Sequence, residues 1–440
     1  MSRQEERVKH FKVYKKRWLV LLITVLVSAT INMQWMQYGI IGDVVTFYYG
    51  ISFEEVNWSS MVFFLVFVAL MVPVSYILDK YNLRINMILA ALSTCVGAWI
   101  KVGSISPDRY WVIVLGQAVV AIACVSSLII PPKVAAAWFP LHELSTAGGI
   151  GIAGVQIGAA IGIVVPPLLI TNHARIETIE NDLFTIAIGV AIVSTTFAVL
   201  VIICFPRTPP SHAAQSDLVH SSCMLQATFK KLFTNRSFLQ LVAVFGIDFG
   251  VFCALLTMMH QVVVLHHPGG YTEAGLIGVL AVLACGMGLI VAGFVLDKFR
   301  CYKGLLLMSQ TVIVTAMVCF TYTFEISLYL VYLTVTIIGL FAGILWSGSV
   351  EAVIETTYPQ PEGISIGILN GSGQCMGIAL TCLYQTLFNL TKCDKLANNA
   401  MSGFLLLALM VLMYSRIELR RTSANLLKDK DNAGFSKETI

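Results

Sequence analysis

Twelve long apolar runs constrain this chain more than any other feature of its sequence. A helix needs about 20 apolar residues to cross the hydrocarbon core of a bilayer. Only 12% of the residues are charged, against roughly 25% in soluble proteins. We therefore predict an all-α integral membrane protein with twelve transmembrane helices. The runs lie near residues 18–42, 57–78, 85–102, 109–132, 144–170, 183–205, 237–265, 271–296, 304–324, 327–352, 362–389 and 399–416.

The positive charges gather on one side of these predicted spans. An even number of spans puts both termini on the same side, and 23 of the 28 lysines and arginines fall there. Loops rich in lysine and arginine face the cytoplasm, so we predict that both termini are cytoplasmic. The sequence contains no recognisable retention signal, which makes the plasma membrane the expected location and an intracellular membrane the alternative.

One long polar connection, between the sixth and seventh spans, divides the chain into two halves. It is rich in proline, serine and histidine, unlike the short connections elsewhere. The predicted organisation is a cytoplasmic N-terminal segment (1–17), a six-helix bundle (18–205), a cytoplasmic linker (206–236), a second six-helix bundle (237–416) and a cytoplasmic tail (417–440).

The two halves share sequence features at a constant offset. The turn "YILDKYNLR" follows the second span and "FVLDKFRCYK" follows the eighth, so that Asp79 and Asp297 are 218 residues apart. Gln156 in the fifth span and Gln374 in the eleventh are separated by the same 218 residues. Two independent features at one offset indicate a duplicated six-helix unit.

Twelve spans, a central linker and the two acidic turns resemble the major facilitator superfamily. Its turn motif is Gly-x-x-x-Asp-Arg/Lys-x-Gly-x-Arg/Lys. The resemblance implies a fold of two six-helix halves and a gate at these turns. There a carboxylate would hold a neighbouring helix N-terminus or arginine in one state and release it in the other. The alternative is that these are ordinary solvated turn charges. The matching residues are Asp79, Lys80 and Arg84 in the first copy, and Gly293, Asp297 and Lys298 in the second.

Polar residues interrupt the first span at a depth where they are costly unless they face a cavity or a partner. Asn32 and Trp35 lie on one stripe of that helix, and we expect this stripe to face a central cavity. The alternative for Trp35 is an interfacial position. Gln34 lies about 200° around the helix from Asn32, and for Gln34 and Gln37 hydrogen bonding between helices is the favoured interpretation.

The paired glutamines indicate a site built from both halves. In the fifth span Gly154, Gly158 and Gly162 form a stripe that lets a neighbouring helix approach closely, and Gln156 points away from it. With Gln374 at the equivalent position, each half would offer one carboxamide to a central site. The same offset pairs Trp35 with Cys253.

Few charged side chains lie inside the predicted spans. Asp248 lies near mid-membrane in the seventh span and is a candidate cation anchor, a proton-coupling group or a structural acid. Glu351 and Glu355 lie at the cytoplasmic end of the tenth span, where a structural role is favoured. No basic residue lies at mid-depth, which argues against an anionic substrate. A tryptophan with neutral amides suits a small organic cation, held by cation–π attraction of up to about 2 kcal/mol.

Longer strings, including "NMQWMQYGII", "VNWSSMV", "GAWIKVGS" and "LNGSGQCMGI", resemble the feline leukaemia virus subgroup C receptor (FLVCR) family. The resemblance implies a facilitative carrier of choline and ethanolamine, and members were earlier described as haem transporters. It also implies a pocket in which the tyrosine of the seventh span is replaced here by Cys253, preceded by Phe252. The other implied pocket residues are Asn32, Trp35, Met61, Gln156 and Gln374.

Other functions stay open at this point. The substrate is choline, ethanolamine or both, and Asp248 could compensate for the missing aromatic ring. The alternatives are a haem transporter, a proton-coupled symporter that uses Asp248, and a non-transporting receptor. We expect no catalytic residue, metal, cofactor or nucleic-acid partner, and a monomer in the bilayer.

Overall fold

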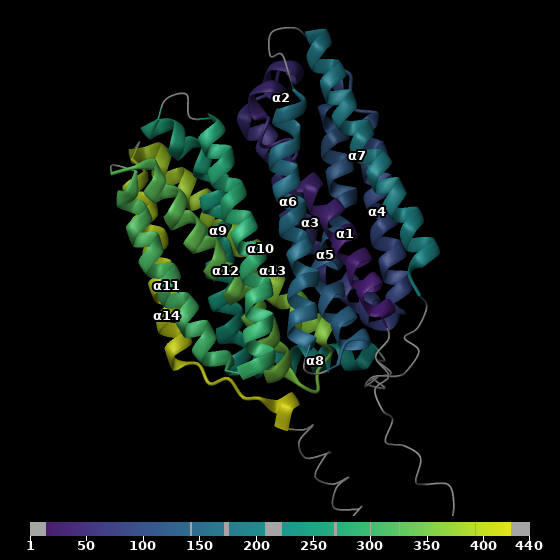
Figure 1. Cartoon of the computed structure of the whole chain (residues 1–440), viewed down its shortest axis with the longest axis vertical. Helices are drawn as coiled ribbons and strands as arrows, with labels where there is room; N and C mark the ends of the chain where they lie inside the picture. Colours follow the sequence, from purple (N-terminus) through teal and green to yellow (C-terminus); the bar gives the residue numbers. More distant parts are fainter. Residues whose placement is uncertain are drawn as a thin grey trace, which may run out of the picture.

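The computed structural model describes residues 15–140, 143–170, 176–206, 222–267, 271–299, 301–324, 326–391 and 393–423. Within them, twelve helices are long and apolar enough to span a membrane, which confirms the predicted number. They stand side by side in two groups (Figure 1). Their bounds are α1 Lys16–Met36, α3 Phe53–Lys80, α4 Leu83–Val102, α5 Tyr110–Trp138, α6 Leu144–Leu169, α7 Ile176–Cys204, α9 Arg236–His266, α10 Tyr271–Phe299, α11 Tyr302–Thr323, α12 Leu328–Thr357, α13 Glu362–Thr391 and α14 Asp394–Tyr414.

Three short helices lie outside these spans. They are α2 (Gly42–Tyr49), the 3₁₀ turn η1 (Pro107–Arg109) and α8 (Ser222–Thr234). α8 falls in the predicted linker, of which residues 207–221 lie outside the described residues. Most of the predicted N-terminal segment and tail also lies outside them.

The first span is shorter than predicted. α1 ends at Met36, and the chain turns before α2 begins at Gly42, so the prediction of one helix through residue 42 is wrong. α2 has anchoring contacts of its own, since the Tyr49 hydroxyl donates a hydrogen bond to the Ser104 carbonyl (3.1 Å). Trp35 therefore lies in the last turn of α1, where the helix gives way to irregular backbone.

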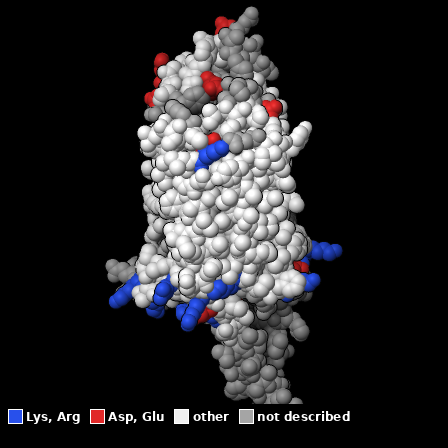
Figure 2. All heavy atoms as spheres, turned by 90° about the vertical axis from the view of Figure 1, so that its left-hand side faces the viewer, with Lys and Arg blue, Asp and Glu red and all other residues white. Residues whose placement is uncertain are grey.

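The first and last described residues lie at the same end of the molecule (Figure 1). On the face drawn in Figure 2, most lysine and arginine side chains surround this end, while most acidic side chains lie at the opposite end. We call it the basic end. The charge asymmetry that the sequence predicted is therefore present on the folded surface.

The two halves pack tightly against each other near the basic end. α6 crosses α10 so closely that a Cβ atom at Gly149 would overlap the backbone of Leu289, and one at Gly293 would overlap that of Ser145. On the other side of the interface, a Cβ atom at Gly371 of α13 would overlap the Met71 side chain of α3. Glycine is what permits these approaches. The basic end is consequently closed.

Candidate functional site

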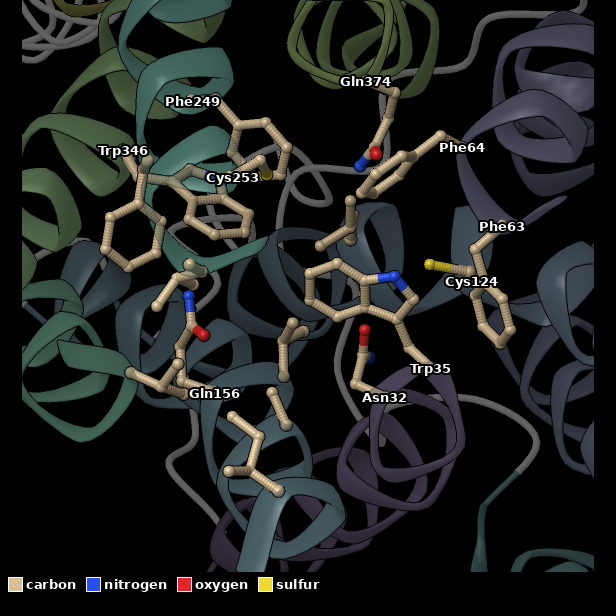
Figure 3. Close-up of a pocket in the computed structure, with 17 residues that line it drawn as sticks. Asn32, Trp35, Phe63, Phe64, Cys124, Gln156, Phe249, Cys253, Trp346 and Gln374 are labelled. Carbon is tan, nitrogen blue, oxygen red and sulfur yellow. The ribbon is translucent and has the colours of Figure 1, made fainter. Parts of the chain in front are cut away.

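An inner cavity lies between the halves, with a free volume of about 40 Å³ (Figure 3). It brings together residues from eight spanning helices, four in each half. Six of the eight predicted substrate-binding residues line it: Asn32, Trp35, Gln156, Phe252, Cys253 and Gln374.

The Trp35 ring forms one wall of this cavity. Its centroid lies 5.5 Å from that of Phe64, with the ring planes tilted by 60°. Asn32, one turn earlier, donates through Nδ2 to the Ser28 carbonyl (2.8 Å) and to the Ser127 hydroxyl (3.3 Å). These bonds fix the amide so that its oxygen points toward the Trp35 ring (Figure 3). The stripe predicted for α1 thus offers an aromatic face and an acceptor to the cavity.

The two glutamines reach the cavity from opposite halves (Figure 3). Gln156 of α6 donates through Nε2 to the Cys285 sulfur (3.1 Å) of α10, which leaves its carbonyl oxygen for the cavity. Gln374 of α13 is buried, and its Oε1 atom has no hydrogen-bond partner among the described residues. Buried acceptors without a partner are costly, so both oxygens are available to a ligand that donates hydrogen bonds.

Two aromatic residues that the sequence reasoning missed form the facing wall. Phe249 of α9 and Trp346 of α12 line the cavity and meet edge to face, with centroids 5.2 Å apart and planes at 87°. Phe249 lies one helical turn before Cys253, on the same side of α9. The aromatic surface expected at Cys253 is thus supplied from neighbouring positions.

The repeat offset organises more of the cavity than the glutamines alone. Among its lining residues, Phe64 and Val282 are 218 residues apart, as are Leu128 and Trp346. With the two pairs noted in the sequence, four pairs at one offset line the same space. Subtracting 218 from the number of Trp346 gives Leu128, which lies in a helix next to the predicted stripe of α1. Testing every aromatic residue of the spans in this way could therefore have identified Trp346 from the sequence.

A larger outer chamber, with a free volume of about 150 Å³, lies on the side away from the basic end. Met61, which was predicted to bind substrate, lines this chamber and not the inner cavity. The two spaces adjoin each other, since four residues line both: Trp35, Phe64, Ile163 and Leu256. The larger of the two spaces therefore lies on the side opposite the basic end.

Asp248 lines neither cavity, contrary to the expectation that it belongs to the substrate site. It is only 5% exposed, and Gln310 of α11 lies beside it. Asp248 lies five residues before Cys253, a separation that turns a helix by about 140°. Because Cys253 faces the cavity, Asp248 points away from it. The carboxylate lies within the C-terminal half.

Asp297 makes the contact between halves that was expected of a gate. Its carboxylate, at the end of α10, accepts hydrogen bonds from the backbone N–H groups of Ser145 (2.9 Å) and Thr146 (2.7 Å) and from the Thr146 hydroxyl (2.7 Å). These donors lie in the first turn of α6, whose free N–H groups and dipole favour an anion. We call this contact the polar lock.

The other predicted gating residues make no described contact between the halves. Arg84 donates to the Ile202 carbonyl (2.8 Å) at the end of α7, within its own half. Lys80 lies 5.9 Å from the ring of Tyr76, and Lys298 lies over its sequence neighbour Phe299. The side chain of the remaining candidate, Asp79, lies outside the described residues. Among the candidates whose side chains are described, Asp297 alone contacts the other half.

Comparisons with known proteins agree with this architecture. Residues 20–381 match the Major Facilitator Superfamily. The chain is 34% identical over 427 residues to the human choline/ethanolamine transporter FLVCR2, covering 96% of this chain and 81% of that protein. It is 36% identical over 432 residues to an uncharacterised MFS-type transporter of Caenorhabditis elegans, covering 97% and 73%. A crystal structure of the Escherichia coli fucose:proton symporter FucP shares the fold, with a TM-score of 0.68 at 12% identity over 90% of this chain and 99% of that one.

Proposed function

The chain belongs to the Major Facilitator Superfamily and, within it, to the FLVCR family of transporters, and from this premise we propose that it carries choline, ethanolamine or both across the membrane. The chemistry of the inner cavity is the observation that carries the substrate proposal. None of its described lining residues is lysine, arginine, aspartate or glutamate, while tryptophan, phenylalanine and carboxamides are prominent.

Both substrates match this lining. A quaternary ammonium has no N–H to donate and is held by aromatic faces, which Trp35, Trp346 and Phe249 provide. The ammonium of ethanolamine has three donors and needs acceptors, which the oxygens of Gln156 and Gln374 offer. The hydroxyl that both molecules carry pairs with a carboxamide. The replacement of the family tyrosine by Cys253 is thus compatible with either cation.

We further propose a facilitative mechanism by a monomer with the basic end in the cytoplasm, at the plasma membrane. The outer chamber would admit the cation to the inner cavity, and opening of the polar lock would release it on the other side. A carrier of one cation accumulates it without a coupled ion, because a membrane potential of 100 mV is worth about 2.3 kcal/mol per charge. Haem transport is not proposed, since no histidine is among the described lining residues of the inner cavity.

Uptake of radiolabelled choline and ethanolamine into cells that overexpress the chain tests the proposal. Loss of a cation–π contact of about 2 kcal/mol predicts that Trp35→Ala weakens the apparent affinity about 30-fold. Trp35→Phe should retain most of it, and Gln156→Ala should also impair uptake. Trp111→Ala is the matched control, since Trp111 is 64% exposed on the outer surface of α5. Full uptake by both alanine variants of the cavity, at unchanged surface level, would refute the proposed site.

A further inference from the structure

A lysine is buried near the C-terminal end of α4, within the N-terminal half. Lys101 is 1% exposed and makes no ion pair with a described acidic residue; its Nζ atom donates instead to Oε1 of Gln117 in α5 (3.2 Å). The glycine beside Gln117 provides the room, because a Cβ atom at Gly116 would overlap the stem of the lysine. A buried cation without an acidic partner is costly, so Lys101 depends on the polar atoms and rings that it contacts.

Gln117 connects this lysine to the end of α1. It is fully buried, and its Nε2 atom donates to the main-chain carbonyl of Gln34 (2.9 Å). The last four carbonyls of a helix have no partner within it. Those of Gln34 and Trp35 are among them, because α1 ends at Met36. The Trp35 carbonyl accepts a hydrogen bond from the Ser60 hydroxyl of α3 (3.3 Å), so side chains of neighbouring helices cap the end of α1.

The same lysine contacts the chain beyond the end of α1. Its Nζ atom lies 5.7 Å from the centroid of the Tyr38 ring, within the range of a cation–π contact. Tyr38 is buried and lies in the turn between α1 and α2. A cation is also favourable near the C-terminal end of a helix, where the dipole is negative. We call Lys101 and Gln117 the α1 clamp, since they hold the chain just before and just after Trp35.

The Trp35 ring depends on this stretch of backbone for its position. Its Nε1 atom has no hydrogen-bond partner among the described residues, so no polar contact of its own fixes the indole. The ring packs against Phe64, which belongs to another helix. Neither residue of the α1 clamp lines the inner cavity or the outer chamber. The clamp can therefore act on a ligand only through the residues that it holds.

We infer that Lys101 and Gln117 are positioning residues, which set the affinity of the inner cavity for an organic cation by placing the Trp35 ring. The inference rests on the proposed function and deepens it, because it assigns part of the affinity for the same ligand to residues outside the cavity. Cation–π attraction requires the cation to lie over the face of the ring, so a shift of the end of α1 weakens it. A quaternary ammonium has no N–H group to donate, and it depends on ring faces more than a primary ammonium does. The clamp therefore favours choline over ethanolamine.

The first test observes the Trp35 ring itself and needs no substrate, so its outcome is independent of the transport proposal. The full-length protein is labelled with 5-fluorotryptophan and purified in detergent, and its fluorine NMR spectrum is recorded. The Trp35 resonance is the one that is missing from the spectrum of Trp35→Phe. Gln117→Met and Lys101→Met should each shift this resonance. An unchanged Trp35 resonance in both variants would overturn the inference.

Gln310→Met is the matched control for this spectrum. Gln310 is as fully buried as Gln117, and its Nε2 atom also donates to a main-chain carbonyl, that of Leu405 (3.1 Å). It belongs to α11, however, and lines neither cavity. Its substitution should also lower the thermal unfolding temperature but should leave the Trp35 resonance in place. A shift of equal size in the control would indicate a general loss of packing and contradict the inference.

The second test measures uptake of choline and ethanolamine at matched surface level, to decide whether the clamp acts through Trp35. Gln117→Met should raise the choline concentration for half-maximal uptake about fivefold, a part of the loss expected for Trp35→Ala. The maximal rate should change little, and the value for ethanolamine should rise less. In the Trp35→Ala background the same substitution should have little further effect, because residues that act through one contact are not additive.

The outcomes of the uptake test separate this inference from the proposed function. A fivefold loss in both backgrounds, or an equal loss for the two cations, would overturn the inference alone. Absence of uptake of either cation by the wild-type chain would overturn the proposed function as well.

Discussion

Replacing Asp297 by asparagine should open the basic end, and the size of the effect follows from the polar lock. The carboxylate accepts three hydrogen bonds from the first turn of α6. Asparagine keeps one acceptor oxygen, but an NH₂ group replaces the other oxygen. That NH₂ group is itself a donor, so it cannot accept a hydrogen bond from the N–H group that it faces. One hydrogen bond to a charged group is worth about 1.5–3 kcal/mol, and an anion at a helix N-terminus a further 0.3–1 kcal/mol or so.

The lock is only partly buried, so we take the lower part of this range, about 2 kcal/mol. That corresponds to a roughly 30-fold change in the ratio of closed to open molecules. The assay is amide hydrogen exchange in the first turn of α6, because Ser145 and Thr146 themselves provide the protected N–H groups. Asp297→Asn should reduce their protection about 30-fold.

Lys298→Gln is the control for this experiment. Lys298 adjoins Asp297 in sequence but lies over the Phe299 ring and makes no described contact with the other half. Its substitution should leave the exchange of α6 unchanged. If α6 in Asp297→Asn is as protected as in the wild type, the lock does not hold the basic end closed and our reasoning is wrong.

Two further predictions concern stability and coupling. Gly158→Ala should lower the thermal unfolding temperature measured in detergent, because the added Cβ overlaps the Ala29 backbone of α1. The control is Gly189→Ala, where a Cβ would meet no atom within 4 Å and which should raise the stability by about 0.5–1 kcal/mol. A similar loss of stability in both variants would contradict the packing argument. Asp248→Asn should keep uptake within about twofold and its pH dependence unchanged, because Asp248 lines neither cavity; uptake that loses its pH dependence would instead support a proton-coupled symporter.

The spans and their number could be predicted from the sequence because burial in lipid requires apolar runs of a fixed length. The end of α1 could not, since Gly39 and Gly42 are no stronger a signal than the many glycines inside other spans. The separate α2 depends on hydrogen bonds to the loop around Ser104, more than 50 residues away. A local sequence pattern does not predict contacts of that kind.

The candidate site could be predicted in part. The repeat offset related Trp35 to Cys253 and Gln156 to Gln374, and all four line the inner cavity. Depth along a helix, however, does not say which way a side chain faces. Asp248 and Phe249 are adjacent in sequence, yet only the phenylalanine lines the cavity. The rotation of α9 that decides between them is set by its packing against α13, α14 and α12.

The pairing of lining residues at the repeat offset has a consequence for the shape of the ligand. In three of the four pairs an aromatic residue at one position corresponds to a smaller residue at the other: Trp35 with Cys253, Trp346 with Leu128, and Phe64 with Val282. Two large rings at equivalent positions would fill the space about the pseudo-twofold axis, whereas one large and one small residue leave room beside each ring. The repeat offset thus yields an asymmetric compartment, which fits the cations proposed as substrates because their two ends differ, with a charge at one and a hydroxyl at the other.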